Sequence, residues 1–245
     1  MKKFRFLGII AVAAIIGFSA TSCGGNGGVD GSVGGGGWLG MELTFTNVQV
    51  TTFDYDDSII NFTETRSVVN ASYYNADTGA WVYVGGTGAI TGGLFTFNIA
   101  YPLEDSLAPA EKHEWYHDWY YTFYPLNITP AGALFAALTF QTPSPYYERL
   151  VRGRSTQTIE EDLMYIWADR DVTITGTGGQ NANENDGFTF TFISSNLNLN
   201  LREGWNAVHV RSAIVSQSAN ARTVRQTISH SHPNLPWVLF TLGGD

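Results

Sequence analysis

The sequence Phe188-Thr189-Phe190-Thr191-Phe192, followed closely by Leu197-Asn198-Leu199-Asn200-Leu201, alternates apolar and polar side chains without a break. Successive side chains of a β-strand point to opposite faces of the sheet. The alternation therefore predicts two strands, each with one buried and one solvated face, which is typical of antiparallel sheet. We expect the fold to be all-β.

Strand patterns of the same kind occur on both sides of these two segments. They cover residues 42–46, 67–74, 81–84, 94–99, 163–168, 171–175, 205–210, 222–229 and 237–240. Turn-forming residues separate several of them, as at Asn75–Gly79 and Gly92-Gly93. The pattern of a long amphipathic helix does not occur between them, so we predict an antiparallel β-sandwich, built as one unit or as two packed subdomains.

Residues 149–162 are the candidate boundary between two such subdomains. Arginines at positions 149, 152 and 154 precede acidic residues at positions 160–162. This charge pattern predicts a solvated connection, and an anion site is the alternative. Upstream, residues 131–137 fit either a short helix or a buried strand, because a short apolar run does not distinguish the two.

The N-terminal segment has the organisation of a secretory signal peptide. Lys2, Lys3 and Arg5 precede Phe6–Phe18, a run of thirteen residues that are all apolar or Gly. This run is too short for a membrane span, which needs about 20 residues. Four small residues then lead to Cys23, the only cysteine of the chain. We predict that residues 1–22 are a signal peptide that is removed.

Ala20-Thr21-Ser22-Cys23 resembles the lipobox of bacterial lipoprotein precursors. The form is relaxed and similar to that of spirochaetal lipoproteins, since Ala20 stands where Leu is usual. The resemblance implies that Cys23 carries a diacylglycerol and an amide-linked acyl chain such as palmitate. Two or more chains anchor a protein firmly to a membrane. The expected location is the bacterial cell envelope, at the outer membrane or cell surface rather than the inner membrane.

Residues 23–37 comprise this cysteine and a tether. Nine of the fourteen residues in Gly24–Gly37 are Gly, so this segment should behave as a flexible coil spanning about 20 Å. The remaining residues, 38–245, form the predicted β-sandwich module. Its segments 165–174 and 199–206 are similar to uncharacterised bacterial surface lipoproteins of β-sandwich type, a group that implies a fold but no function.

The charge of the chain excludes some partners. The first 22 residues hold three of the 13 basic residues and none of the 22 acidic ones, so the remainder has a net charge of −12. Such a surface repels phosphate backbones, and we expect no nucleic-acid partner. The expected partners are the membrane, through the lipid on Cys23, and a glycan or a protein.

One segment matches a catalytic motif. His113-Glu114-Trp115-Tyr116-His117 has the H-E-x-x-H pattern, in which the two His bind zinc and the Glu is the general base. The motif requires a helix, which brings positions four apart to one face. Pro109 and the residues after it favour a helix, whereas the aromatic run at 115–124 favours a strand. A zinc-dependent hydrolase is therefore the alternative to a non-enzymatic protein without a cofactor.

The aromatic residues of the same segment suggest a binding surface. The chain has seven Trp and twelve Tyr, and exposed aromatic rings stack on sugars or anchor protein partners. Trp115, Tyr116, Trp119 and Tyr120 are the candidates for such a platform.

Three further segments could hold a metal ion. Asp54–Asp57 and Asn181–Gly187 carry the oxygen ligands that calcium prefers, although both are also typical hairpin loops. His230 and His232 would share a face of a strand, and His209 could join them. No complete catalytic set emerges, so we expect a lipid-anchored envelope protein with a binding or structural role.

Overall fold

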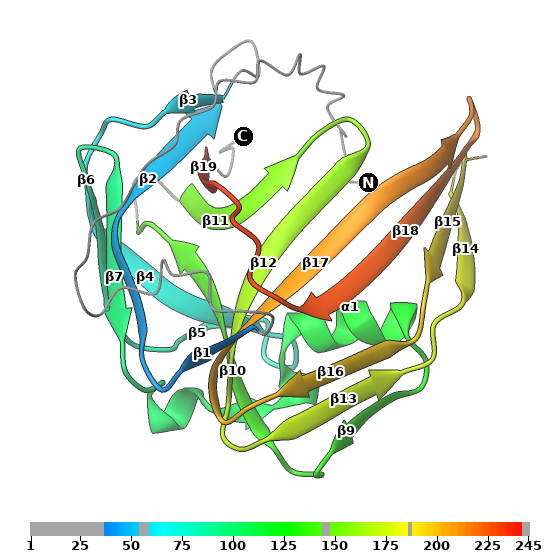
Figure 1. Ribbon diagram of the computed structural model, residues 1–245, viewed down its shortest axis with the longest axis horizontal. Coiled ribbons are helices and arrows are strands. Elements are labelled where there is room, and N and C mark those ends of the chain that lie inside the picture. The colour runs from blue at the N-terminus through cyan, green and yellow to red at the C-terminus, as the bar shows by residue number, and fades with distance from the viewer. Residues whose placement is uncertain (1–36, 54–58, 144–147, 186–187, 242–245) are drawn as a thin grey trace.

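The computed structural model describes residues 37–53, 59–143, 148–185 and 188–241 (Figure 1). The predicted signal peptide, the lipidation site Cys23 and the tether before Gly37 lie outside these residues. Within the described ranges, no helix has the length and apolar character needed to cross a membrane.

Strands make up most of the described chain, which confirms the predicted all-β class. The strands of the first half are β1 (Trp38–Gly40), β2 (Leu43–Phe53), β3 (Ile59–Asn61), β4 (Arg66–Asn75), β5 (Ala80–Tyr83), β6 (Thr87–Thr91), β7 (Leu94–Ile99), β8 (Ala108–Pro109), β9 (Leu126–Thr129) and β10 (Leu134–Gln141). Those of the second half are β11 (Glu148–Ser155), β12 (Ile159–Ala168), β13 (Val172–Gly176), β14 (Gln180–Asn185), β15 (Phe188–Ser194), β16 (Leu197–Leu201), β17 (Gly204–Gln217), β18 (Ala221–His230) and β19 (Trp237–Thr241). The helical segments are the 3-10 turns η1 (Glu104–Ser106) and η2 (Ala110–Lys112) and the helix α1 (Glu114–Thr122).

Eight strands close into a barrel, so the predicted sandwich is wrong. Their order is β2-β7-β6-β4-β10-β12-β11-β19, and β19 returns to pair with β2. The β19–β2 pairing is parallel, and the other pairings around the barrel are antiparallel. Closure satisfies strand edges that a sandwich would leave open.

The closure depends on β10, which changes partners along its length. Its first half pairs with β12, while its second half pairs with both β11 and β4. The 131–137 segment, which the sequence left open, is thus partly a strand. Strand β6 completes the ring between β7 and β4.

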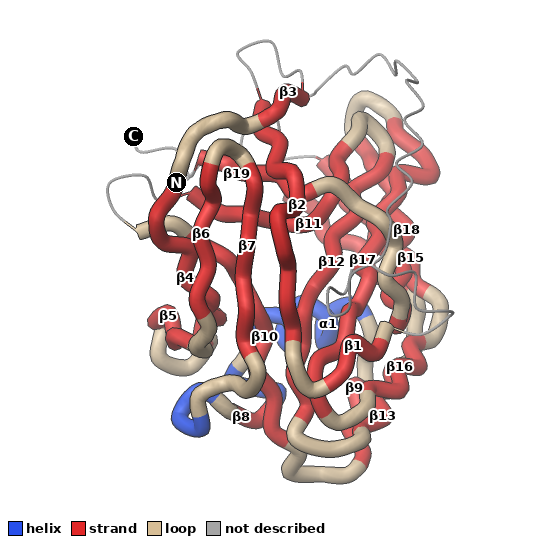
Figure 2. The backbone as a smooth tube through the Cα atoms, turned by 60° about the vertical axis from the view of Figure 1, so that its left-hand side comes forward, coloured by secondary structure: helices blue, strands red, loops and turns tan. Residues whose placement is uncertain are grey.

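The predicted connection at residues 149–162 is also wrong. These residues belong to the hairpin of β11 and β12, whose strands pair directly in the wall of the barrel. Strand β12 continues beyond the barrel into a wing, in which β17, β18, β15 and β14 follow in order (Figure 2). The chain therefore has one continuous large sheet, and β12 belongs to both the barrel and the wing.

Aromatic side chains fill the barrel. Phe45 lies at the centre of this cluster, with ring centroids 4.9 Å from Trp237 and 5.1 Å from Tyr165. The other aromatic members are Phe95, Phe97 and Phe140. Because the interior is filled by large side chains at short distances, it is a core and not a channel.

A buried ion pair joins two strands of the barrel. The guanidinium of Arg66 on β4 donates two hydrogen bonds to the carboxylate of Glu148 on β11, at 2.6 and 2.7 Å. Both side chains are less than a tenth exposed. The exposed Glu64 and the ring of Phe62 also contact the same guanidinium.

The hydrophobic core of the barrel continues under a smaller sheet beside it. Strands β16, β13 and β9 form a three-stranded sheet, in which the alternation of Leu197–Leu201 appears as predicted, with each Leu buried and each Asn exposed. Phe188–Phe192 also forms a strand, but its side chains are not sorted into one buried and one exposed face. The reason is its position in the wing, between β14 and β18.

A candidate binding cavity on the outer face of the barrel

Four of the five residues of the HEWYH segment, Glu114–His117, lie in helix α1, which settles the choice that the sequence left open. Trp115, Trp119 and Phe123 recur at intervals of four residues and are 4%, 2% and 1% exposed. This spacing places them on one face of a helix. The Trp115 ring packs edge-on against Phe135 of β10, at 5.7 Å between centroids. Burial of this face outweighs the general preference of aromatic residues for strands.

The two histidines of the motif have separate roles in this arrangement. His113 lies outside α1, at its N-cap, with extended backbone angles (φ −98°, ψ 139°). Its ring is buried, and Nε2 donates a hydrogen bond to the carbonyl oxygen of Phe135 at 3.1 Å. Burial lowers the pKa of His113 to about 4. His117 instead donates from Nε2 to the carbonyl oxygen of Glu111 at 2.9 Å.

The described residues contain no group of three His, Cys, Asp or Glu side chains that could hold a metal ion. Glu114, the candidate general base, is exposed on α1. The H-E-x-x-H match therefore lacks the paired imidazoles that the zinc chemistry requires, and the geometry does not support the hydrolase alternative.

The other predicted metal segments have different outcomes. Asp54–Asp57 lies outside the described residues, as do the last two positions of Asn181–Gly187. The first part of that second segment is strand β14 rather than a loop. His209 lies 3.4 Å from the carboxylate of Glu161, and His232 accepts a hydrogen bond from Arg152 at 3.1 Å. His230 lies on β18 with its pKa lowered by burial.

The expected aromatic platform does not form as an exposed surface. Trp115 and Trp119 are core residues, as their burial shows, and Tyr116 is half-buried. The side chain of Tyr120 is not among the described ones. Trp115 and Trp119 nevertheless border a cavity, so a role in ligand binding stays a prediction for them.

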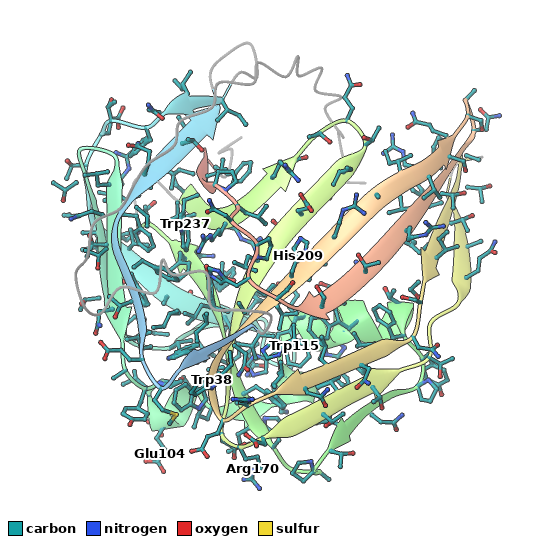
Figure 3. The ribbon with its side chains drawn as sticks, in the orientation of Figure 1. Trp38, Glu104, Trp115, Arg170, His209 and Trp237 are labelled. Atoms are coloured by element: carbon teal, nitrogen blue, oxygen red, sulfur yellow. The ribbon has the colours of Figure 1, made fainter. Side chains whose placement is uncertain are left out.

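This cavity has a volume of about 1080 Å³. It extends over β10, β11 and β12, next to α1, and reaches β19, β18 and β4. Phe140, Tyr165 and Trp237 of the barrel core also border it. Figure 3 shows Trp115 on α1, with His209 and Trp237 higher on β17 and β19. Small-molecule pockets usually measure about 300–1,000 Å³, so the cavity can take a ligand larger than a single sugar.

The position of Asp162 identifies which face of β12 lines the cavity. Asp162 pairs with Gly153 on β11 and with Val210 on β17, and all three border the cavity. A Cβ atom added to Gly153 would stand 2.5 Å from Oδ1 of Asp162, so this carboxylate lies directly over the glycine. The alternate residue Glu161 does not border the cavity, and its carboxylate pairs with Arg154 instead.

Four carboxylates border the cavity, two from α1 and two from β12. They are Glu114, Asp118, Glu160 and Asp162. None of them forms an ion pair within the described residues. Arg149 partly offsets the rise in the pKa of Asp162, and His117 does the same for Asp118.

The recessed position of these carboxylates changes their acidity. Asp162 stays accessible to solvent, yet the protein surrounds it. This desolvation, together with repulsion from Glu160, raises the pKa of Asp162 to about 6. Desolvation and repulsion from Glu114 likewise raise the pKa of Asp118. No hydrogen bond from the protein contributes to either pKa, so both carboxylates can accept hydrogen bonds from water or from a ligand.

Two further polar atoms at the cavity have no hydrogen-bond partner in the structure. They are the indole Nε1 of Trp115 and the amide Oε1 of Gln226, and both atoms are buried. A buried polar atom without a partner costs roughly 1–3 kcal/mol. Both atoms have almost no solvent exposure, so a ligand in the cavity would reach them only after a small rotation of these side chains.

Arg152 and Arg154 also border this cavity, but their side chains are engaged by other parts of the protein. Arg152 is buried and donates to the carbonyl oxygen of Leu235 at 3.1 Å and to the hydroxyl of Tyr165 at 3.2 Å. Arg154 forms an ion pair with Glu161. These two arginines of the basic cluster therefore serve the protein's own packing.

The sequence did not identify the cavity residues Asp162, Gln226 and Tyr74. They come from β12, β18 and β4, which are far apart in the chain. The one local signal was the alternation of acidic residues at 160 and 162, which predicts a shared face. Comparison with protein-family models, curated proteins and solved structures gives no match.

Proposed function

We propose that this chain is a lipid-anchored protein of the bacterial cell envelope that binds a neutral, polyhydroxylated ligand in the outer-face cavity and performs no chemistry on it. The observation that carries the proposal is the set of unsatisfied polar groups in the cavity, which includes both hydrogen-bond acceptors and a donor.

The chemistry of these groups selects the class of ligand. The carboxylates of Asp118 and Asp162 can accept hydrogen bonds, whereas the indole N–H of Trp115 needs an acceptor. A hydroxyl group supplies both, because it donates one hydrogen bond and accepts others. Four carboxylates would repel an anionic group placed beside them, and two of the arginines that border the cavity, Arg152 and Arg154, are already engaged within the protein. An ammonium group has no atom that could accept a hydrogen bond from the indole N–H.

The proposed location rests on the sequence. The signal-peptide pattern, the lipobox at Cys23 and the glycine-rich tether together support export and lipid anchoring. A tether of about 20 Å would hold the barrel clear of the lipid headgroups. The membrane is then a partner only through the lipid, and the ligand is met on the solvent side.

The anchor can be tested separately from the ligand. Bacteria that produce the full-length chain are labelled with a radioactive palmitate, and the chain is compared with Cys23→Ala. We expect label and membrane association in the natural chain and neither in the variant. Unlabelled natural chain, or a variant that fractionates with membranes as before, would contradict the anchoring proposal.

Ligand binding is tested with the purified full-length protein in detergent on an array of neutral saccharides of one to six sugars. We expect binding to at least one structural series, lowered about tenfold or more by Asp162→Asn, since a hydrogen bond to a charged group contributes about 1.5–3 kcal/mol. Asp105→Asn, an exposed substitution on η1, is the control and should bind normally. Absence of binding across the array would refute the proposed ligand class.

A further inference from the structure

An exposed aromatic strip runs along the edge of the sheet next to the cavity. Trp81 and Tyr83 on β5 are each 47% exposed. They are two positions apart on one strand, so their rings lie on the same face about 7 Å apart along the strand. Strand β5 is the last strand on this side of the sheet, and its outer edge has no partner in the described sheet.

Tyr74 connects this strip to the cavity. It pairs with Trp81 across β4 and β5, and their rings meet edge-on at 5.5 Å between centroids. Tyr74 also borders the cavity itself. The aromatic strip, which we define as Tyr74, Trp81 and Tyr83, is therefore continuous with the proposed binding site.

The strip is held in a fixed position relative to α1. The turn after β4 contacts η2 through a hydrogen bond from the backbone N–H of Ala76 to the carbonyl oxygen of Lys112, at 2.9 Å. An ion pair between Lys112 and Asp77 links the same two segments. Asn75 and His113 add a β-bridge directly before α1. The carboxylates of α1 and the aromatic strip thus belong to one rigid surface.

We infer that Tyr74, Trp81 and Tyr83 form a second subsite, on which an oligosaccharide that occupies the cavity with one end stacks its following sugar rings. This inference rests on the proposed function and specifies that the ligand is an oligosaccharide rather than a single sugar. Aromatic faces bind the apolar faces of sugar rings, while the polar edges of those rings remain in water. Large exposed aromatic rings next to a polar cavity suit such a ligand better than an apolar protein surface.

The arrangement predicts a dependence of affinity on chain length. A monosaccharide reaches only the cavity, whereas a chain of three or four sugars also reaches the strip. Each stacked ring should contribute about 1 kcal/mol, so affinity should rise about fivefold with each sugar that reaches a ring.

The test compares Trp81→Ala/Tyr83→Ala with the natural chain by titration calorimetry, with saccharides of one to six sugars from the series that the array identifies. We expect the double variant to lose about tenfold or more in affinity for the longer chains and to keep its affinity for the monosaccharide. Tyr101→Ala is the matched control, since Tyr101 is 62% exposed but does not border the cavity. Thermal unfolding of each variant checks that the barrel is intact.

The outcomes separate the inference from the proposed function. The second subsite would be overturned if the double variant bound long saccharides as tightly as the natural protein does. If Asp162→Asn still reduced binding in that case, the cavity proposal would stand. The second subsite would also be overturned if the affinity of the natural protein did not rise with the length of the saccharide. Absence of all saccharide binding would overturn both.

Discussion

The two faces of strand β12 differ in how their polar groups are satisfied. On the inner face, Glu161 pairs with Arg154 and lies 3.5 Å from Arg211, and Tyr165 accepts a hydrogen bond from a buried arginine. On the outer face, Glu160 and Asp162 form no ion pair within the described residues. The inner polar groups therefore stabilise the fold, whereas the outer ones are the groups to which we propose that a ligand binds.

Breaking the buried ion pair between Arg66 and Glu148 should have the largest effect on the stability of the protein. Glu148→Ala removes the partner of a buried guanidinium, and we expect a loss of about 3–5 kcal/mol in the free energy of unfolding. Urea denaturation followed by tryptophan fluorescence measures it.

Two comparisons sharpen this result. The double variant Arg66→Met/Glu148→Met should recover much of the loss, because apolar residues of similar size tolerate burial without a charge partner. Lys112→Ala, which breaks an exposed pair, should change stability little. A Glu148→Ala protein as stable as the natural chain would show that the buried pair does not hold the barrel.

Substitution of Gly153, the residue opposite Asp162, should lower stability by a smaller amount. In Gly153→Ala the new methyl group would stand 2.5 Å from Asp162 Oδ1 and 2.6 Å from the carbonyl oxygen of Glu161. We expect a loss of about 1–3 kcal/mol, as for other overpacked sites, together with weaker saccharide binding because Asp162 must move. The matched substitution is Gly179→Ala, where a Cβ meets no atom within 4 Å. Equal stability of the two variants would contradict the close packing over Gly153.

Asp162→Asn should give the smallest change in stability and one that depends on pH. The pKa of Asp162 is about 6 in the folded chain, above its ordinary value of 3.8. The folded state then binds more protons than the unfolded state between about pH 4 and pH 6, so this carboxyl makes the protein less stable as pH rises through that range. Asparagine removes the effect, and the variant should gain stability relative to the natural chain as pH rises to 7. A stability difference that is constant from pH 4 to pH 7 would show that the outer face does not perturb this group.

The positions of most strands could be predicted because alternation is a local property. Closure into a barrel could not, because it depends on the change of partners along β10 and on the parallel pairing of β19 with β2. The general preference of aromatic residues for strands also gave the wrong indication at α1, where the burial of Trp115 and Trp119 favours a helix. The cavity could not be predicted from local sequence either, because its carboxylates, amide and aromatic rings come from four distant segments.

The parallel pairing of β19 with β2 has a consequence for the order of events during synthesis. The hydroxyl of Thr52 on β2 donates to the carbonyl oxygen of Leu239 on β19, across 187 positions of the chain. At ~5–20 residues per second, roughly 10–40 s pass between the synthesis of these two strands. The barrel therefore cannot close before β19 has left the ribosome, and an unclosed chain of this kind would suit the export that we propose for this protein.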